Sequence, residues 1–221
     1  MDVRNVRAVI LTANLYQELE FWYPFLRLKE AGARVTVAAA KADELYGSKL
    51  GVPVVSDVAV SGIDPSSFDL LVIPGGFAPE ALRMNADVLD LVRKTNEQRK
   101  LIAAICHAPW VLVSAGIAEG RRLTCVPGIR DDVRNGGAVV LDEPVVRDGN
   151  LITSRLPNDL DAFCAEIIRA LEAQPEPSDG PGARRELPAS SASADYAQAV
   201  TVRSAAAGPG SANYRQYAAY G

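Results

Sequence analysis

The sequence predicts an α/β fold in which a mainly parallel sheet is covered by helices on both faces. Through the first 173 residues, short runs of β-branched and apolar residues alternate with segments of helical period. The short runs are apolar throughout, as expected for strands that are buried on both faces. Hydrophobic residues make up 48% of the chain, which is enough for one sizeable core.

The predicted elements follow one another in a regular order. The predicted strands are 6–12, 34–40, 68–76 and 101–105, followed by a hairpin over 145–154 that turns at Asp148–Gly149. The predicted helices are 16–32, 86–100, 108–116 and 158–173. Gly32 and Gly116 are typical helix-stop residues, and Asn158 is placed to cap the last helix. Pro24 lies inside the first helix and is predicted to kink it.

The composition changes near residue 173. Residues 174–221 are rich in Ala, Ser, Gly and Pro, which cannot bury enough apolar surface to offset the entropy of ordering. We interpret them as a linker or disordered tail outside a domain of residues 1–173. The alternative is a docking segment, because four spaced tyrosines can provide contacts: Tyr196, Tyr214, Tyr217 and Tyr220.

Charge and motif content exclude several classes of protein. The net charge of −4 and the pI of about 5.1 argue against nucleic-acid binding and against an acidic membrane surface. No apolar run is long enough to span a membrane, and the N-terminus does not resemble a signal peptide. Three widely spaced cysteines favour a reducing, cytoplasmic setting. We expect no metal and no cofactor, because the chain lacks a His/Cys cluster and a GxGxxG motif after its first strand.

The only histidine of the chain follows a cysteine where a predicted strand becomes a helix. In parallel sheets, sites lie at the carboxyl ends of strands, and backbone N–H groups at such an elbow are free to face a ligand. Cys106 is therefore a candidate nucleophile whose thiolate is expected to be stabilised there. The N–H groups of His107, Gly75 and Gly76 are candidates for an oxyanion site, and the His107 side chain for a proton shuttle. The alternative is a buried structural cysteine, and the turn can also point the two side chains apart.

Glu20 and Cys164 are two further titratable residues in the predicted helices. Glu20 follows the first strand and lies close to the same edge, so its carboxyl group is a candidate to exchange protons with the sulfur or the substrate. Its alternative role is that of an exposed helix glutamate. Cys164 lies on the apolar side of the last predicted helix, where core packing is expected.

Several motifs together resemble the PfpI branch of the DJ-1/PfpI superfamily. They are "LTANLYQELEFWYPFLRLKEAG", "LVIPGGFAPEALR", "AAICHAPWVLVSAG", "CVPGIRDDVRNGG" and "LITSRLPNDLDAF". Their order and spacing match over residues 6 to about 172, and the rest of the chain lies outside the resemblance. The resemblance implies a flavodoxin-like three-layer sandwich, related to the class I glutamine amidotransferases.

The resemblance also implies roles for individual residues. Cys106 would be the nucleophile, Glu20 the carboxylic acid paired with its sulfur, and His107 its neighbour. Gly75 and Gly76 would form the oxyanion site together with the backbone of His107. The segment "TSRLPND", residues 153–159, would lie near the site entrance.

Members of this branch are oligomers, so the resemblance implies a dimer or a hexamer. Glu80 would then reach the histidine of a neighbouring subunit. Two positions depart from the common pattern: Gln17 replaces an acidic residue, and Trp110 stands where many members carry a smaller or polar residue. Either departure can reshape the pocket.

Three functions are compatible with these residues. The first is a cofactor-free, cysteine-dependent enzyme acting on small reactive carbonyls, of the glyoxalase III or deglycase type. The second is a cysteine peptidase or amide hydrolase, and the third is a redox-responsive, chaperone-like protein without turnover. The first is favoured because five aromatic residues are expected to narrow the site: Tyr16, Phe21, Trp22, Phe77 and Trp110. The alternative is that some of them pack in the core or at a subunit contact.

Overall fold

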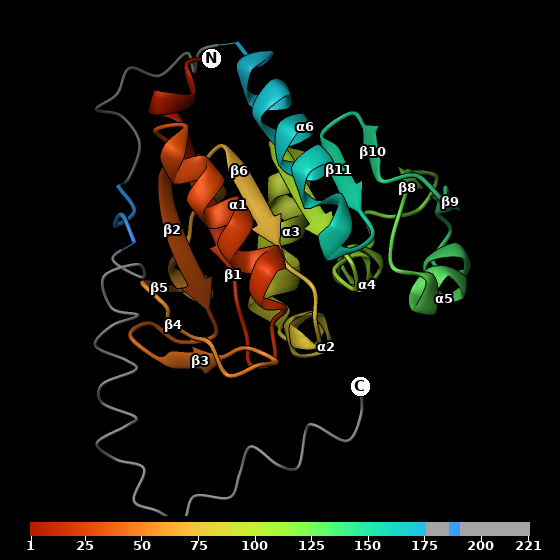
Figure 1. Ribbon diagram of the computed structural model, residues 1–221, viewed down its shortest axis with the longest axis horizontal. Helices are drawn as coiled ribbons and strands as arrows, with labels where there is room; N and C mark the ends of the chain where they lie inside the picture. The colour runs from red at the N-terminus through yellow and green to blue at the C-terminus, as the bar shows by residue number, and fades with distance from the viewer. Residues whose placement is uncertain (176–185, 191–221) are drawn as a thin grey trace, which may run out of the picture.

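The computed structural model describes residues 1–175 and 186–190, and its main sheet has seven strands (Figure 1). Their spatial order is β10-β11-β7-β6-β1-β2-β5. The bounds are β1 Arg7–Leu11, β2 Arg34–Ala39, β5 Val58–Ala59, β6 Leu70–Ile73, β7 Leu101–Ile105, β10 Val145–Asp148 and β11 Leu151–Ser154. Only the β10–β11 pair is antiparallel. The predicted mainly parallel sheet is therefore confirmed.

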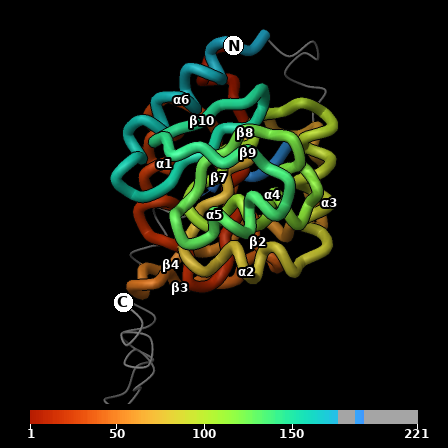
Figure 2. Tube along the Cα trace, turned by 90° about the vertical axis from the view of Figure 1, so that its right-hand side faces the viewer, coloured from red at the N-terminus to blue at the C-terminus, as the bar shows by residue number. Residues whose placement is uncertain are grey.

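Helices cover both faces of this sheet, as predicted. Their bounds are α1 Glu18–Glu30, α2 Ala78–Arg83, α3 Ala86–Glu97, α4 Pro109–Ser114, α5 Arg130–Asn135 and α6 Leu160–Glu172. Helices α1 and α6 lie on one face, and α3 and α4 lie on the other (Figures 1 and 2). The three layers bury every residue of the central strands β1, β6 and β7 except Arg7, which accounts for the apolar runs in the sequence.

Shorter elements complete the domain and were not predicted. Two small sheets pair β3 Leu45–Gly47 with β4 Pro53–Val55, and β8 Arg122–Leu123 with β9 Val139–Val140. These strands have two or three residues each, too few to produce a clear pattern of alternation. Helices α2 and α5 have six residues each and were also missed.

Two local predictions concern Pro24 and Asn158. Helix α1 continues through Pro24 from Glu18 to Glu30, and the kink at this residue stays a prediction. The predicted Asn158 cap is wrong, because α6 begins at Leu160 and its capping position is Asp159. Residues Pro157–Asp159 form a 3-10 turn that leads directly into the helix, so Asn158 lies inside this turn.

Part of the C-terminal extension lies against the edge of the main sheet. Strand β5 pairs only with Ala38 and Ala39, which leaves the first half of β2 open. Along this half, the Ser190 N–H donates to the Val35 carbonyl oxygen at 2.7 Å, and Leu187 is only 7% exposed. Residues 186–190 thus cover the open edge. The four tyrosines of the alternative, a docking segment, lie outside the described residues.

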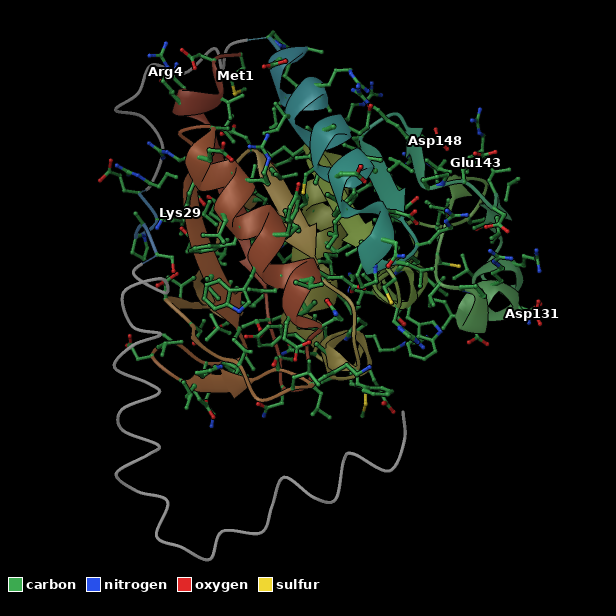
Figure 3. All side chains as sticks on the ribbon, in the orientation of Figure 1. Met1, Arg4, Lys29, Asp131, Glu143 and Asp148 are labelled. Atoms are coloured by element: carbon green, nitrogen blue, oxygen red, sulfur yellow. The ribbon has the colours of Figure 1, made fainter. Side chains whose placement is uncertain are left out.

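The N-terminus lies next to the end of α6 (Figure 3). The Met1 ammonium donates to the Glu172 carbonyl oxygen at 3.0 Å, which connects the first and last turns of the domain. Among the described residues, none of the helices has the length and apolar character needed to cross a membrane.

Candidate active site

Cys106 occupies a strained turn between β7 and α4. Its φ of 64° lies in the left-handed region that residues with a side chain seldom adopt. Two backbone hydrogen bonds hold it there: the Cys106 N–H donates to the Ser154 carbonyl oxygen at 3.0 Å, and its own carbonyl accepts from Val126 N–H at 3.1 Å. Neighbouring segments therefore fix a conformation that presents the side chain at the carboxyl edge of the sheet, as the predicted elbow requires.

The side chain of His107 turns toward the sulfur rather than away from it. The distance between Cys106 Sγ and His107 Nδ1 is 3.2 Å. The backbone N–H groups of Gly76 and His107 also interact with the sulfur and favour its ionised form. The question that the sequence left open, whether the imidazole reaches the thiol, is thereby answered.

Glu20 is a buried acid and not an exposed helix glutamate. It lies in the first turn of α1 and is 0% exposed. Its Oε2 accepts a hydrogen bond from Gly75 N–H at 2.9 Å, and its own N–H donates to the Gln17 side-chain oxygen at 2.8 Å. Gln17, noted as a departure in the sequence, thus caps α1 and orients Glu20. Oε1 of Glu20 is buried and has no hydrogen-bond partner.

Gly75 allows the carboxyl group and the cysteine to approach each other. A Cβ atom on Gly75 would lie 2.4 Å from Glu20 Oε2 and 2.6 Å from Cys106 Cβ. No side chain fits between them. Because the Gly75 N–H is bound to Glu20, the N–H groups that face the sulfur are those of Gly76 and His107. In the folded protein, the predicted oxyanion group is therefore centred on these two residues.

Burial sets the protonation of the acid and of the thiol. Removal from water raises the pKa of Glu20 to about 7, although the contacts with Cys106 and Gly75 N–H oppose this shift. Burial and the neighbouring Glu20 charge raise the pKa of Cys106 to about 12. The expectation of a thiol that is acidic on its own is therefore wrong. Burial therefore disfavours the charged form of both groups.

His107 is enclosed by two aromatic rings. Its ring centroid lies 5.2 Å from that of Trp110 and 6.3 Å from that of Phe77. Burial, assisted by the charge of Lys49, lowers the pKa of His107, which keeps the imidazole neutral at physiological pH. A neutral imidazole has one nitrogen that can accept a proton.

The other aromatic residues expected at the entrance lie elsewhere. Tyr16 and Phe21 are completely buried, and the Tyr16 hydroxyl donates to the Val52 carbonyl oxygen at 2.7 Å. Trp22 packs against this group and donates to the Tyr16 hydroxyl. The alternative of core packing therefore holds for Tyr16 and Phe21, whereas Phe77 and Trp110 flank the histidine.

Glu80 and the segment 153–159 were also expected near the site. Glu80 is exposed in the first turn of α2, a few residues after Gly75 and Gly76. Segment 153–159 begins on β11, where the Ser154 carbonyl holds the elbow. The Arg155 side chain forms ion pairs with Asp159 and Asp142. Within the described ranges, no group of three or more His, Cys, Asp or Glu residues is arranged to hold a metal ion.

Two cations near the histidine were not predicted from the sequence. Lys49 Nζ lies 5.2 Å from the centroid of the Phe77 ring, and the Arg83 guanidinium lies 5.4 Å from that of Trp110. Lys49 lies between β3 and β4, far from the motifs in the sequence, so no local pattern marked it.

A positive-φ cysteine on a strand-to-helix elbow, beside a buried glutamate and a histidine, defines a class of α/β proteins with a cysteine-centred site. The model of the DJ-1/PfpI family matches residues 6–170, and the chain belongs to this family. The resemblance inferred from the motifs is confirmed.

Several relatives are named for an activity. A deglycase of Pyrococcus abyssi is 42% identical over 167 residues, covering 76% of this chain and 100% of the relative. The deglycase PfpI of Pyrococcus furiosus is 40% identical, with the same coverage of both chains. The sequence-based expectation of a deglycase-like enzyme thus agrees with the names of these relatives.

Solved structures show the same fold. Drosophila melanogaster DJ-1beta superposes with a TM-score of 0.72 at 34% identity, covering 76% of this chain and 91% of that one. A two-domain protein of Anabaena variabilis with DJ-1/ThiJ/PfpI-like and ferritin-like domains gives a TM-score of 0.75 at 37% identity. This match covers 82% of the present chain and 52% of the Anabaena chain.

Proposed function

We propose that the protein is a cofactor-free, cysteine-dependent enzyme acting on small reactive carbonyls, in the manner of a deglycase or glyoxalase. The observation that carries the proposal is the position of the Cys106 thiol between two proton acceptors. His107 Nδ1 lies 3.2 Å from the sulfur, and the Glu20 carboxyl group has a pKa of about 7. A group with this pKa can accept and return a proton at neutral pH.

The first step is addition of the thiol to an aldehyde. As the Cys106 sulfur forms a bond to the aldehyde carbon, the carbonyl π electrons move to oxygen. The thiol proton passes to Glu20 or His107, which removes the need for a free thiolate. The N–H groups of Gly76 and His107 are placed to stabilise the negative oxygen until it is protonated, which yields a hemithioacetal.

The following steps convert the hemithioacetal of an oxoaldehyde into a hydroxy acid. A proton leaves the former aldehyde carbon and another is added to the adjacent carbonyl carbon through an enediol, which gives a thioester of Cys106. We assign this transfer to Glu20, because burial raises its pKa to about 7, so that it can both accept and donate a proton at neutral pH. Water then cleaves the thioester and releases the acid and the free thiol. For methylglyoxal, the sum is one aldehyde plus one water giving one lactate.

The test is lactate formation from methylglyoxal by the full chain. We expect turnover in the wild type and a loss of at least about a thousandfold in Cys106→Ser, as is typical for loss of a nucleophile. Cys164→Ala serves as the matched control, because this cysteine is also buried. Absence of Cys106-dependent lactate formation would reject the proposal.

A cysteine peptidase is the second candidate, since the same Cys106–His107 contact suits attack on an amide. A panel of fluorogenic peptides, corrected for the Cys106→Ser background, separates the two functions. Cleavage of peptides without reaction of methylglyoxal would favour the peptidase. If neither substrate reacts, mass spectrometry of Cys106 after mild peroxide treatment tests a redox-responsive role.

We further propose that the enzyme works in the cytoplasm as a dimer or hexamer, with Glu80 reaching the His107 of a neighbouring subunit. Exposure of Glu80 on α2, close in sequence to Gly76, supports this arrangement. Light scattering combined with activity measurements tests it. A fully active monomer would contradict the cross-subunit role.

A further inference from the structure

Each of the two aromatic rings beside His107 also has a cation close to it. Lys49 Nζ lies 5.2 Å from the Phe77 ring centroid, and the Arg83 guanidinium lies 5.4 Å from the Trp110 ring centroid. Within the described ranges, neither cation forms an ion pair.

Backbone hydrogen bonds hold Lys49 next to the site. The Lys49 N–H donates to the Tyr16 carbonyl oxygen at 2.9 Å, and Tyr16 itself pairs with Gly76 through an isolated β-bridge. Gly76 is one of the residues whose N–H faces the Cys106 sulfur. The backbone of Lys49 is thus connected through Tyr16 to Gly76, which belongs to the predicted oxyanion group.

The charge of Lys49 reaches both proton acceptors of the site. It lowers the pKa of His107 and opposes the rise in the pKa of Glu20. Arg83 is not among the groups that shift either residue, and its Nε donates to the Ser114 hydroxyl at 2.9 Å. The two cations therefore differ in their access to the reacting centre.

We propose that Lys49 is a specificity-determining residue that favours carbonyl substrates carrying a carboxylate or another anionic group beyond the reacting aldehyde. This inference rests on the proposed function and names the substrate class of the same site. An exposed ammonium without a protein carboxylate is free to bind an anion. Phe77, which is also exposed, gives the substrate an apolar surface between this cation and the imidazole.

The experiment uses two substrates that differ in one charge. 4-Carboxyphenylglyoxal and 4-carbamoylphenylglyoxal have the same reacting centre and nearly the same shape. The readout is the ratio of kcat/KM for the anionic substrate to that for the neutral one. Because the ratio is taken within each variant, any effect of Lys49 on the protonation of Glu20 or His107 affects both substrates and cancels.

We expect the wild type to prefer the anionic substrate. The ratio should fall about fivefold in Lys49→Met and further in Lys49→Glu, as expected for one charge acting across a partly exposed site. In the matched control Arg83→Met, the ratio should stay within about twofold of the wild type. An unchanged ratio in Lys49→Met, or an equal fall in Arg83→Met, would overturn the proposal.

A second readout does not depend on turnover. Iodoacetate and iodoacetamide alkylate the same thiol and differ in one negative charge, so the ratio of their rates at Cys106, followed by mass spectrometry, reports anion preference directly. We expect this ratio to fall about threefold or more in Lys49→Met. If alkylation shows the preference and no glyoxal is turned over, the proposed function fails and the role of Lys49 stands. If the alkylation ratio is unchanged, the role of Lys49 fails whatever the enzyme does.

Discussion

Cys106 and Cys164 are buried to a similar extent, but polar groups surround the first and the apolar core surrounds the second. They are 7% and 3% exposed, and removal from water raises the pKa of each thiol to about 12. Cys106 lies at positive φ beside an acid, an imidazole and two N–H groups, whereas Cys164 lies within α6 as part of the apolar core. Burial and the pKa of the thiol therefore do not distinguish the candidate nucleophile from a cysteine of the core. The difference lies in the presence of groups that can take the proton.

The sharpest test of this comparison is Glu20→Gln, which removes the buried acid that is hydrogen-bonded to Cys106. We expect kcat/KM for methylglyoxal to fall by about 10²–10⁴-fold, the usual contribution of a general acid–base residue. In the wild type, kcat/KM should rise with pH up to about 7, as the Glu20 carboxylate forms, and this limb should be absent from the residual activity of the variant. Unchanged turnover would exclude a role for Glu20 in proton transfer.

Above about pH 7, where Glu20 is ionised in the wild type, Glu20→Gln should raise the free energy of unfolding. The pKa of Glu20 is raised from 4.5 to about 7 on folding, so the folded state holds the extra proton. The free energy of unfolding should therefore fall as pH rises from about 4.5 to 7, by about 3 kcal/mol in total. Glu20→Gln should remove this decline, which denaturant unfolding at pH 5 and pH 8 measures. A decline of equal size in the variant would show that other groups cause it.

The second test fills the space between Glu20 and Cys106. Gly75→Ala places a Cβ 2.4 Å from the carboxyl oxygen and 2.6 Å from the cysteine Cβ, so the two groups must separate. We expect at least about a hundredfold loss of turnover, because small displacements of reacting groups have such effects. Overpacking should cost about 1–3 kcal/mol of stability.

Gly62→Ala is the matched control for this substitution. A Cβ at Gly62 meets no atom within 4 Å, and its φ is not positive. Turnover and stability should therefore stay near the wild-type values. If Gly75→Ala retains full activity, close contact between Glu20 and Cys106 is not required for the reaction.

Elements determined by contiguous residues were predicted from the sequence, whereas side chains placed by long-range packing were not. The central strands were predicted because each is a continuous apolar run, and the elbow because a strand, Cys106 and a helix follow directly in the chain. The burial of Tyr16 and Phe21 was not predicted, because aromatic residues near a strand end can face either the core or the entrance. Lys49 was missed for a similar reason, since only pairing with Tyr16 brings its loop to the site.

The pKa of Cys106 is raised, which is opposite to the direction that the strand-to-helix elbow predicts. A strand-to-helix elbow predicts free N–H groups, and two of them do face the sulfur. The sequence did not reveal that Glu20 is completely buried beside Cys106. Burial of the thiol and the charge of Glu20 raise the pKa of Cys106 by more than the N–H groups lower it. A thiol pKa depends on long-range packing, which no local motif encodes.

The smallest expected effect is that of Cys164→Ala, which tests the structural side of the comparison. Cys164 lies in the apolar core, and the charges that act on its pKa, from Arg27 and Asp161, have opposing effects. Removing its sulfur from the core should cost about 1 kcal/mol of stability, the order expected for one buried apolar group. Turnover per folded molecule should stay within about twofold of the wild type, and alkylation of Cys106 should be unaffected. A tenfold fall in turnover with the stability preserved would mean that α6 transmits a change to the site, and that Cys164 is more than a packing residue.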